Sequence, residues 1–420
     1  MSFSMRKSRT YHDPIHGAIS LRGDDPVEAL LIELIDTPEF QRLRRIRQLE
    51  VAALTFHGAE GSRFTHSLGV FAIARRIFDR LAYDYPMLSP FRALALCAAL
   101  LHDVGHGPYS HASEHIFNYD HEDWTRRVIL GPTHIARLLT SFAPELPDQL
   151  CQLLSKTHPV PALIQLVSGQ LDCDRLDYLL RDSYFTGAQY GHLDLDRIIH
   201  AIDYDPATQS LVIRGRKGLV AIEHYLVVRH FMYSQVYHHP KNMAARFILQ
   251  QAFEQARTQA LHGGLEVDEV MKAWLVGSVD QLPLETYLAS DDTVFNYHLH
   301  RWSRHADSLL RDLARRFLDR DLFKTREVTH LSDLHCQFVL NRLRTAVAEA
   351  GFAPESYCTI QGTEVKGYTL YEQGILLREG ERLRELADVS LLVRSLIQPE
   401  TRLWLIYPRE VEGHLQKLLA

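Results

Sequence analysis

The pattern of apolar and polar residues along the chain predicts a mainly helical protein. Residues 93–101 are nine consecutive apolar residues, which is typical of a helix that is buried on all sides. Residues 26–35 begin with proline, which is favoured in the first turn of a helix. Residues 36–49 carry an apolar residue at every third position, and Thr37 and Pro38 supply an N-cap and a first helical residue.

Helical patterns continue through most of the chain. A helix is expected to begin near Thr65, and two amphipathic helices are expected between residues 132 and 156. The region 218–261 has a long helical pattern that Pro240 must kink or interrupt. Further helices are predicted over residues 266–276, 292–304 and 305–320.

Short strands complete the predicted elements. Residues 11–21 suggest a turn followed by a strand, and residues 203–214 suggest a hairpin, because breakers flank short apolar stretches. In the tail, strands are expected around 367–370, 375–377 and 402–407. The glycines at 263 and 264 mark a boundary, so we expect a helical region over 1–264 and an α+β region over 265–420 that serves support, oligomer contacts or regulation.

Composition narrows the class of protein. The chain has 420 residues, which is more than one core usually accommodates, and its net charge of −6 gives no reason to expect general nucleic-acid affinity. Its five cysteines form no CxxC pair, which favours reduced thiols. We find no signal-peptide pattern and no apolar run near the roughly 18 residues that span a bilayer. A cytoplasmic protein without a membrane partner is therefore expected.

The strongest candidate chemistry follows the buried segment 93–101. His102 and Asp103 come directly after it, and burying such side chains is unfavourable unless something pairs with both. A divalent cation would compensate both at once, although a mixed set of imidazole and carboxylate does not name the metal. The glycines at 105 and 107 then break the helix and let the backbone approach a ligand.

Two other histidines leave alternatives open. His66 lies among apolar residues in the first turn of its predicted helix, where a single histidine is more often structural than a ligand. His121 precedes Glu122, which indicates either a polar helix start capped by Asp120 or a histidine that a carboxylate orients for acid–base chemistry.

A third group lies on one predicted helix. Asp174, Tyr178 and Asp182 follow at intervals of four residues and therefore share one face. That face fits contact with a sugar or a metal, but ion pairing with neighbouring arginines is an equally simple explanation. The four arginines of residues 42–47 likewise fit either a solvated face or a phosphate-binding surface.

The order His66, then His102-Asp103, then Asp174 resembles the H…HD…D pattern of the HD superfamily of metal-dependent phosphohydrolases. The flanking segments make the chain similar to the deoxynucleoside triphosphate (dNTP) triphosphohydrolases of that superfamily; these segments are residues 13–17, 36–44, 63–70, 102–111, 121–122, 172–178 and 235–239. The resemblance covers residues 9–260 well and the C-terminal part weakly. It implies an all-helical HD core within residues 1–264, with small β-hairpins beside it.

The resemblance also implies roles for individual residues. His66, His102, Asp103 and Asp174 would hold one divalent metal per subunit, with Mn, Mg, Fe, Zn, Co and Ni not distinguished. The catalytic set would be Asp103, His106, His111, His121 and Glu122. The three histidines would surround the α-phosphate, and His121, held by Glu122 or Glu114, would protonate the leaving 5′-oxygen.

Substrate and activator contacts are implied in the same way. The triphosphate would bind to Arg63, Arg175 and Arg229, and the deoxyribose to Gln48, Tyr178 and Asp182. Leu49 and Tyr237 would exclude a 2′-hydroxyl group. A GTP or dNTP activator would bind between subunits of a dimer or tetramer at Arg9, Asp36, Gln41 and Arg44.

The predicted reaction is water attack on the α-phosphorus of a dNTP, which releases a deoxynucleoside and inorganic triphosphate. Arg63, Arg175 and Arg229 are the residues that favour a triphosphate as the substrate. If they do not converge on the metal, the alternative is a phosphodiesterase or nucleotidase that acts on smaller nucleotides. A second alternative is a nucleotide-sensing or nucleic-acid-binding protein with little catalysis.

Overall fold

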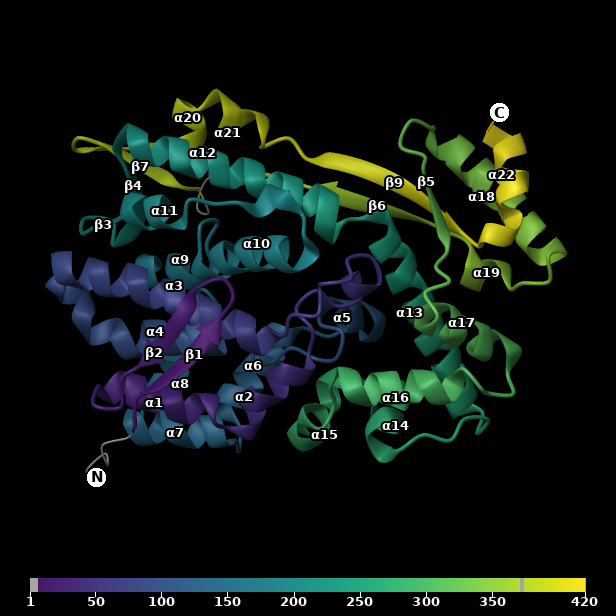
Figure 1. Ribbon diagram of the computed structural model, residues 1–420, viewed down its shortest axis with the longest axis horizontal. Helices are drawn as coiled ribbons and strands as arrows, with labels where there is room; N and C mark the ends of the chain where they lie inside the picture. The colour runs from purple at the N-terminus through teal and green to yellow at the C-terminus, as the bar shows by residue number, and fades with distance from the viewer. Residues whose placement is uncertain (1–6, 371–373, 420) are drawn as a thin grey trace.

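The computed structural model describes residues 7–370 and 374–419, and most of them are helical. The prediction of a mainly α fold is therefore confirmed. Figure 1 shows the helices of the first half of the chain gathered in one block, with α14 to α17 beside it. The long strands β6 (Thr359–Val365) and β9 (Glu400–Tyr407) run from the first block toward α18 and α22.

The buried helix α4 (Arg92–Leu101) is the centre of the first block, as its apolar sequence predicts. Every residue from Leu94 to Leu101 is buried, and His102 follows directly as the C-cap. The helices that pack against α4 are α1 (Pro26–Ile35), α3 (Arg63–Asp84), α8 (Leu146–Leu154) and α9 (Pro161–Ser168). The block also contains α5 (His111–Phe117), α6 (His121–Leu130), α7 (His134–Phe142) and α10 (Cys173–Thr186).

The helix predicted over residues 36–49 is shorter than expected. Thr37 does cap α2 (Pro38–Arg42), but after one further 3-10 turn Ile46 adopts extended backbone with φ of −120°. Arg47 then forms a β-bridge with Ser62, and its N–H donates to Asp292 at 3.0 Å. These long-range bonds replace the helical ones, so the apolar periodicity overstated the length of the helix.

Three small sheets accompany the helices. The N-terminal hairpin pairs β1 (Arg9–Asp13) with β2 (Gly17–Leu21), which adds one strand to the prediction. The predicted hairpin forms from β3 (Ile202–Asp205) and β4 (Ser210–Arg214), and β7 (Leu376–Glu379) and β8 (Arg382–Glu385) extend it. The third sheet has the order β5 (Lys324–Glu327), β9, β6.

The strand predicted around 367–370 is wrong. The Tyr368 N–H donates to the Leu396 carbonyl at 3.0 Å, and the Thr369 N–H donates to the Gln170 side chain at 2.9 Å. These backbone groups are satisfied by a loop and a side chain, so no strand partner is needed there. The other two predicted tail strands correspond to β7 and β9.

The long helical pattern before residue 261 forms two helices, as Pro240 predicts. After the short α11 (Leu195–Ala201), α12 (Gly215–Met232) runs into a π-helical turn over Tyr233–Tyr237. Pro240 then begins α13 (Pro240–Leu261). The C-terminal helices are α14 (Glu269–Val276), α15 (Leu284–Leu288), α16 (Asp292–Trp302), α17 (Ser308–Leu318), α18 (Asp333–Glu349), α19 (Pro354–Tyr357), α20 (Leu386–Val389), α21 (Leu391–Ser395) and α22 (Glu412–Leu419).

Two large apolar cores hold these elements, and each draws on both sides of residue 264. The first core, around α4, includes Tyr368 and Leu377 from the tail. The second, around α13 and α16, includes Tyr109 and Trp124 from the segments that follow α4. The division into regions 1–264 and 265–420 stays a prediction. Residues of the later region pack directly against the segments that follow α4, which carry candidate site residues. No helix in the described ranges is long and apolar enough to cross a membrane.

Candidate active site

Four side chains from three helices meet at the end of α4. His66 comes from α3, His102 and Asp103 from the end of α4, and Asp174 from α10. Ligand atoms of His66, His102 and Asp103 lie within 4.8 Å of one another. The Oδ1 atom of Asp174 lies 3.0 Å from Nε2 of His66 and 3.8 Å from Nε2 of His102.

This cluster fits a divalent cation. Nε2 of His66 and Nε2 of His102 are buried and have no hydrogen-bond partner in suitable geometry among the described residues, yet carboxylates lie beside them. Burial acts to lower the pKa of His66, but Asp174 and Asp177 outweigh it and raise the pKa to about 10. Positive charge is therefore favoured where the two rings and the carboxylates meet. Two imidazoles and two carboxylates form a donor set that several divalent metals accept.

Arg63 lies against the same carboxylate. One terminal nitrogen of its guanidinium is paired with Oδ2 of Asp103, and its Nε donates to Oγ of Ser110 at 2.7 Å. Burial would raise the pKa of Asp103, but Arg63 and His102 hold it well below its usual range. Arg63 is thus beside the cluster, where it keeps Asp103 ionised.

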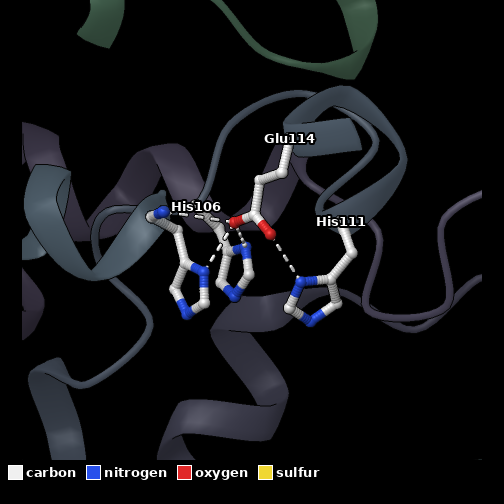
Figure 2. Close-up of side chains that lie close together, drawn as sticks. His106, His111 and Glu114 are labelled. Carbon is white, nitrogen blue, oxygen red and sulfur yellow. Dashed lines mark hydrogen bonds and ion pairs between the residues drawn. The ribbon is translucent and has the colours of Figure 1, made fainter. Parts of the chain in front are cut away.

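Glu114 of α5 is the common partner of three histidines. Its oxygens lie 2.7 Å from Nδ1 of His111, 2.5 Å from Nδ1 of His121 and 3.6 Å from Nδ1 of His106. Figure 2 shows the Glu114 side chain extending toward the His106 and His111 rings. The rings of His106 and His121 are stacked, with centroids 3.7 Å apart. One carboxylate therefore contacts both His111 and His121, and His106 joins the cluster by stacking on His121.

The same contacts set the charge of the cluster. Burial raises the pKa of Glu114, but hydrogen bonds from His111 and His121 hold it well below its usual range. Burial lowers the pKa of His111, but its hydrogen bond to Glu114 prevails and the pKa is raised. Burial, Arg63 and His121 hold the pKa of His106 well below its usual range, so His106 is neutral at physiological pH. The cluster offers both neutral and protonated imidazoles to a ligand.

A cavity of about 940 Å³ joins the two clusters. His102, Asp103 and Asp174 lie on its wall, together with His106, His111 and His121. Other predicted site residues on the wall are Gln48, Leu49, Arg63, Glu122, Arg175, Tyr178, Asp182 and Tyr237. Many of the residues that the sequence predicted for the site therefore line the same cavity.

The residues predicted to contact a sugar form a compact group on that wall. The Tyr237 hydroxyl donates to Oδ2 of Asp182 at 2.8 Å, and the hydroxyls of Tyr178 and Tyr233 are 3.1 Å apart. Leu49 belongs to a small apolar cluster against which Tyr237 packs. These contacts bring α10 and the π-helical turn together, so the predicted Asp-Tyr-Asp face lies on the cavity.

The three arginines that were predicted to bind a triphosphate differ in whether they line the cavity. Arg175 lines the cavity, and its Nε donates to the Gly169 carbonyl at 2.9 Å. Arg229 is not among the residues that line the cavity, and its guanidinium lies over the Tyr233 ring at 5.6 Å. Two nitrogens of Arg229 are buried without a hydrogen-bond partner among the described residues. Two of the three predicted arginines, Arg63 and Arg175, therefore reach the cavity.

The four residues predicted to bind an activator lie near the N-terminal hairpin and α2. Arg9 forms an ion pair with Asp36, and Nε of Arg44 donates to Oε1 of Gln41 at 2.8 Å. None of the four is among the residues described as lining the cavity. They form two adjacent pairs along β1, the end of α1, and α2 with its following turn.

Comparison with known proteins decides the family. The HD domain family model matches residues 63–147, and the HD associated region matches residues 193–273. The chain is 36% identical over 417 residues to the uncharacterized protein YwfO of Bacillus subtilis, which covers 97% of this chain and 94% of that protein. The chain belongs to the HD superfamily.

Other relatives carry functional names. This HD protein is 26% identical over 268 residues to the deoxynucleoside triphosphate triphosphohydrolase SAMHD1 homolog of Dictyostelium discoideum, across 60% of this chain and 50% of that protein. A solved phosphohydrolase from Bacteroides thetaiotaomicron shares the fold with a TM-score of 0.84 and 28% identity. That match covers 96% of this chain and 100% of the other. The resemblance to the HD superfamily is confirmed.

Two parts of the HD protein's candidate site were not predicted from the sequence. Strand β6 contributes residues 361–364 to the cavity wall, although the tail carries no clustered ligand pattern. Asp177 contacts His66 from behind, at 2.7 Å. Its spacing of four residues from Arg181 is a signal that could have indicated an ion pair, which the sequence suggested only as a surface interaction.

Proposed function

We propose that this HD protein is a metal-dependent dNTP triphosphohydrolase. One observation carries the proposal: three of the four proposed metal ligands (His102, Asp103 and Asp174), the three histidines around Glu114 and the residues predicted to contact deoxyribose all border one cavity. The relatives named as triphosphohydrolases support it further. The cavity volume of about 940 Å³ is in the range of pockets that hold ligands of nucleotide size.

His66, His102, Asp103 and Asp174 are the residues proposed to hold the ion. A divalent metal bound there would supply a Lewis acid for the α-phosphate and for the attacking water. Arg63 and Arg175 then balance charge on the triphosphate, since guanidinium groups match phosphate oxygens. Neutral His106 can donate a hydrogen bond to a phosphate oxygen without adding charge.

His121 is the proposed general acid, with Glu114 rather than Glu122 as the carboxylate that orients it. In the proposed reaction the oxygen of water bonds to the α-phosphorus, the bond from that phosphorus to the 5′-oxygen breaks, and His121 gives its proton to the 5′-oxygen. The attacking water loses one proton to solvent, and His121 regains a proton from solvent before the next turnover. The products are a deoxynucleoside and inorganic triphosphate. His111 shares the same carboxylate and has a raised pKa, so it is the second candidate for the proton donor.

Product analysis tests the proposal. The purified protein is incubated with each dNTP and each rNTP in the presence of Mn²⁺ or Mg²⁺, and phosphorus NMR identifies the products. Inorganic triphosphate together with deoxynucleoside is the expected result. Release of pyrophosphate or orthophosphate from the dNTP would contradict the reaction class.

One observation favours a second candidate, hydrolysis of a smaller nucleotide. Arg229 is not described as lining the cavity, and the guanidinium of Arg63 is engaged by Asp103. Arg63, Arg175 and Arg229 therefore do not all converge on the metal-binding cluster as free cations, although Lys156, Arg126 and Arg246 also line the cavity. Deoxynucleoside monophosphates and cyclic dinucleotides belong in the same product screen, and faster turnover of these than of dNTPs would favour the second candidate.

Regulation and assembly belong to the same proposal. GTP or a dNTP is proposed to bind at Arg9, Asp36, Gln41 and Arg44 between subunits of a dimer or tetramer. On a different part of the molecule, Leu334 and Phe338 lie one turn apart on α18 and are 79% and 56% exposed, which supports burial of this α18 surface in an oligomer. Light scattering with and without GTP measures the oligomer, and loss of GTP activation in Arg44→Ala tests the site.

A further inference from the structure

Asp177 of α10 lies behind the proposed metal ligand His66, outside the cavity. Its side chain is completely buried, and its Oδ2 atom lies 2.7 Å from Nδ1 of His66. A carboxylate has no proton to give, so Nδ1 of His66 is the donor in this bond. Nε2 of His66 therefore faces Asp103 and Asp174, and it is the nitrogen that would offer a lone pair to a cation held between them.

Arg181, one turn further along α10, fixes the plane of the Asp177 carboxylate. Its guanidinium donates to both oxygens of Asp177, at 2.7 and 3.0 Å. A third bond from Arg181 reaches Oδ2 of Asp13 at 2.9 Å. Arg181 is itself fully buried, so its charge is compensated only by these two carboxylates among the described ion pairs.

The N-terminal hairpin supplies the last contact. Nε2 of His16 lies 2.6 Å from Oδ1 of Asp177, and the His16 ring is 6% exposed. Asp13 shapes the turn that places this ring, because its Oδ1 accepts the N–H groups of Ile15 and His16 at 2.9 Å each. Gly17 completes the turn with φ of +69°, a conformation that favours glycine.

Helix α3 is shaped to admit this network. A Cβ atom at Gly69 would lie 1.9 Å from Oδ1 of Asp177 and 2.5 Å from a terminal nitrogen of Arg181. Any larger residue there would push the carboxylate away from His66, three residues earlier on the same helix. The glycine therefore permits the close approach of α10 to α3 at the metal ligand.

We propose that Asp177 is a positioning residue for the metal ligand His66, and that the N-terminal hairpin completes the metal centre through His16 and the Asp13–Arg181 pair. Carboxylates behind a metal-bound histidine fix its tautomer and orientation, and their loss typically weakens metal binding about 10- to 100-fold. The inference rests on the proposed metal ligands. It gives a role in metal affinity to residues 13–17, which lie outside the HD domain match over 63–147.

Metal binding to the full-length, metal-free protein tests the inference without any substrate. The dissociation constant for Mn²⁺ is measured by electron paramagnetic resonance of the free ion, and the visible spectrum of the Co²⁺ form reports the coordination geometry. Asp177→Asn is compared with Asp196→Asn, an aspartate that is 75% exposed. His16→Leu is compared with His12→Leu on the exposed side of the same hairpin.

We expect Asp177→Asn to weaken Mn²⁺ binding by about 10- to 100-fold and to change the Co²⁺ spectrum, with Asp196→Asn unchanged. His16→Leu should weaken binding by a smaller factor, and His16→Gln should restore part of it because glutamine keeps a donor for Asp177. Wild-type affinity in a folded Asp177→Asn protein would overturn the inference. If that variant does not fold, His16→Leu decides: affinity equal to that of His12→Leu overturns the inference, and weaker affinity supports it.

His66→Ala separates this inference from the proposed function. If His66→Ala loses Mn²⁺ binding while Asp177→Asn and His16→Leu both keep wild-type affinity, the positioning role is overturned and the ligand assignment of His66 stands. Wild-type affinity in His66→Ala would overturn the ligand assignment on which both rest.

Discussion

The Glu114 carboxylate lies 2.5 Å from Nδ1 of His121, whereas the neighbouring Glu122 is exposed. The sequence left both glutamates open as the partner of this histidine. The difference arises because α6 begins at His121 and turns Glu122 outward, while the preceding helix α5 presents Glu114 to the ring. The contact identifies Glu114 as the carboxylate that supports the histidine cluster.

Replacing Glu114 should therefore cost more activity than replacing Glu122. We expect Glu114→Gln to lower kcat about 100-fold, because general acid–base groups contribute at least that much and His111 and His121 lose the carboxylate that they share. Glu122→Gln should lower kcat only a few-fold. Steady-state kinetics with a dNTP and Mn²⁺ measures both, and equal losses would contradict the assignment.

Removing the metal should abolish activity and lower thermal stability. A ligand at about 100 times its Kd stabilises the folded state by about 2.7 kcal/mol, so adding Mn²⁺ to chelator-treated protein should raise Tm. Asp103→Ala should be inactive and should show a much smaller rise. Differential scanning calorimetry with and without Mn²⁺ measures the rise, and full activity after exhaustive chelation would refute the metal assignment.

Tyr237 should restrict the sugar. Its ring packs at the apolar cluster that contains Leu49, and its hydroxyl is held by Asp182. We expect Tyr237→Ala to raise the ratio of rNTP to dNTP kcat/KM about 10-fold, because a steric pocket wall discriminates by only a few kcal/mol. An unchanged ratio in this variant, with Leu49→Ala also unchanged, would remove these residues from the sugar site.

Asp182 should make stability depend on pH. Burial raises the pKa of Asp182 to about 7, although the hydrogen bond from Tyr237 lowers it. The folded protein therefore binds this proton more tightly than the unfolded chain, where the pKa is about 3.9. The resulting stabilisation is complete below the unfolded pKa and is lost as pH rises through 7, by up to about 1.4 kcal/mol per pH unit.

Asp182→Asn removes that proton equilibrium and should flatten the profile. Urea unfolding between pH 4.5 and 7.5 measures the free energy of unfolding for wild type and variant. The wild-type advantage should shrink as pH rises, and the exposed Asp196→Asn should follow wild type. Parallel profiles for wild type and Asp182→Asn would show that Asp182 does not titrate in this range.

Local patterns predicted the elements well where short-range forces dominate. The apolar residues 93–101 form a buried helix that ends at His102, and Thr37 and Pro38 begin α2 as expected. The prediction failed where distant groups compete for the backbone. Asp292 takes the Arg47 N–H and ends the predicted helix early, and Gln170 takes the Thr369 N–H in place of a strand.

The sequence by itself selected the side chains that are proposed for the chemistry: the histidines and aspartates of the H…HD…D order, the extra histidines after them, and the Asp174, Tyr178 and Asp182 face. The shared face of Asp174, Tyr178 and Asp182 follows from a spacing of four residues, which a chain displays without folding, whereas the H…HD…D set was assigned through its resemblance to a known superfamily. Only the tertiary structure decided how they are supported. It set Glu114 rather than Glu122 against His121, placed the Arg229 guanidinium over the Tyr233 ring, and brought His16 and Asp177 behind His66. Such contacts join residues up to 161 positions apart, so their geometry arises from packing and not from local pattern.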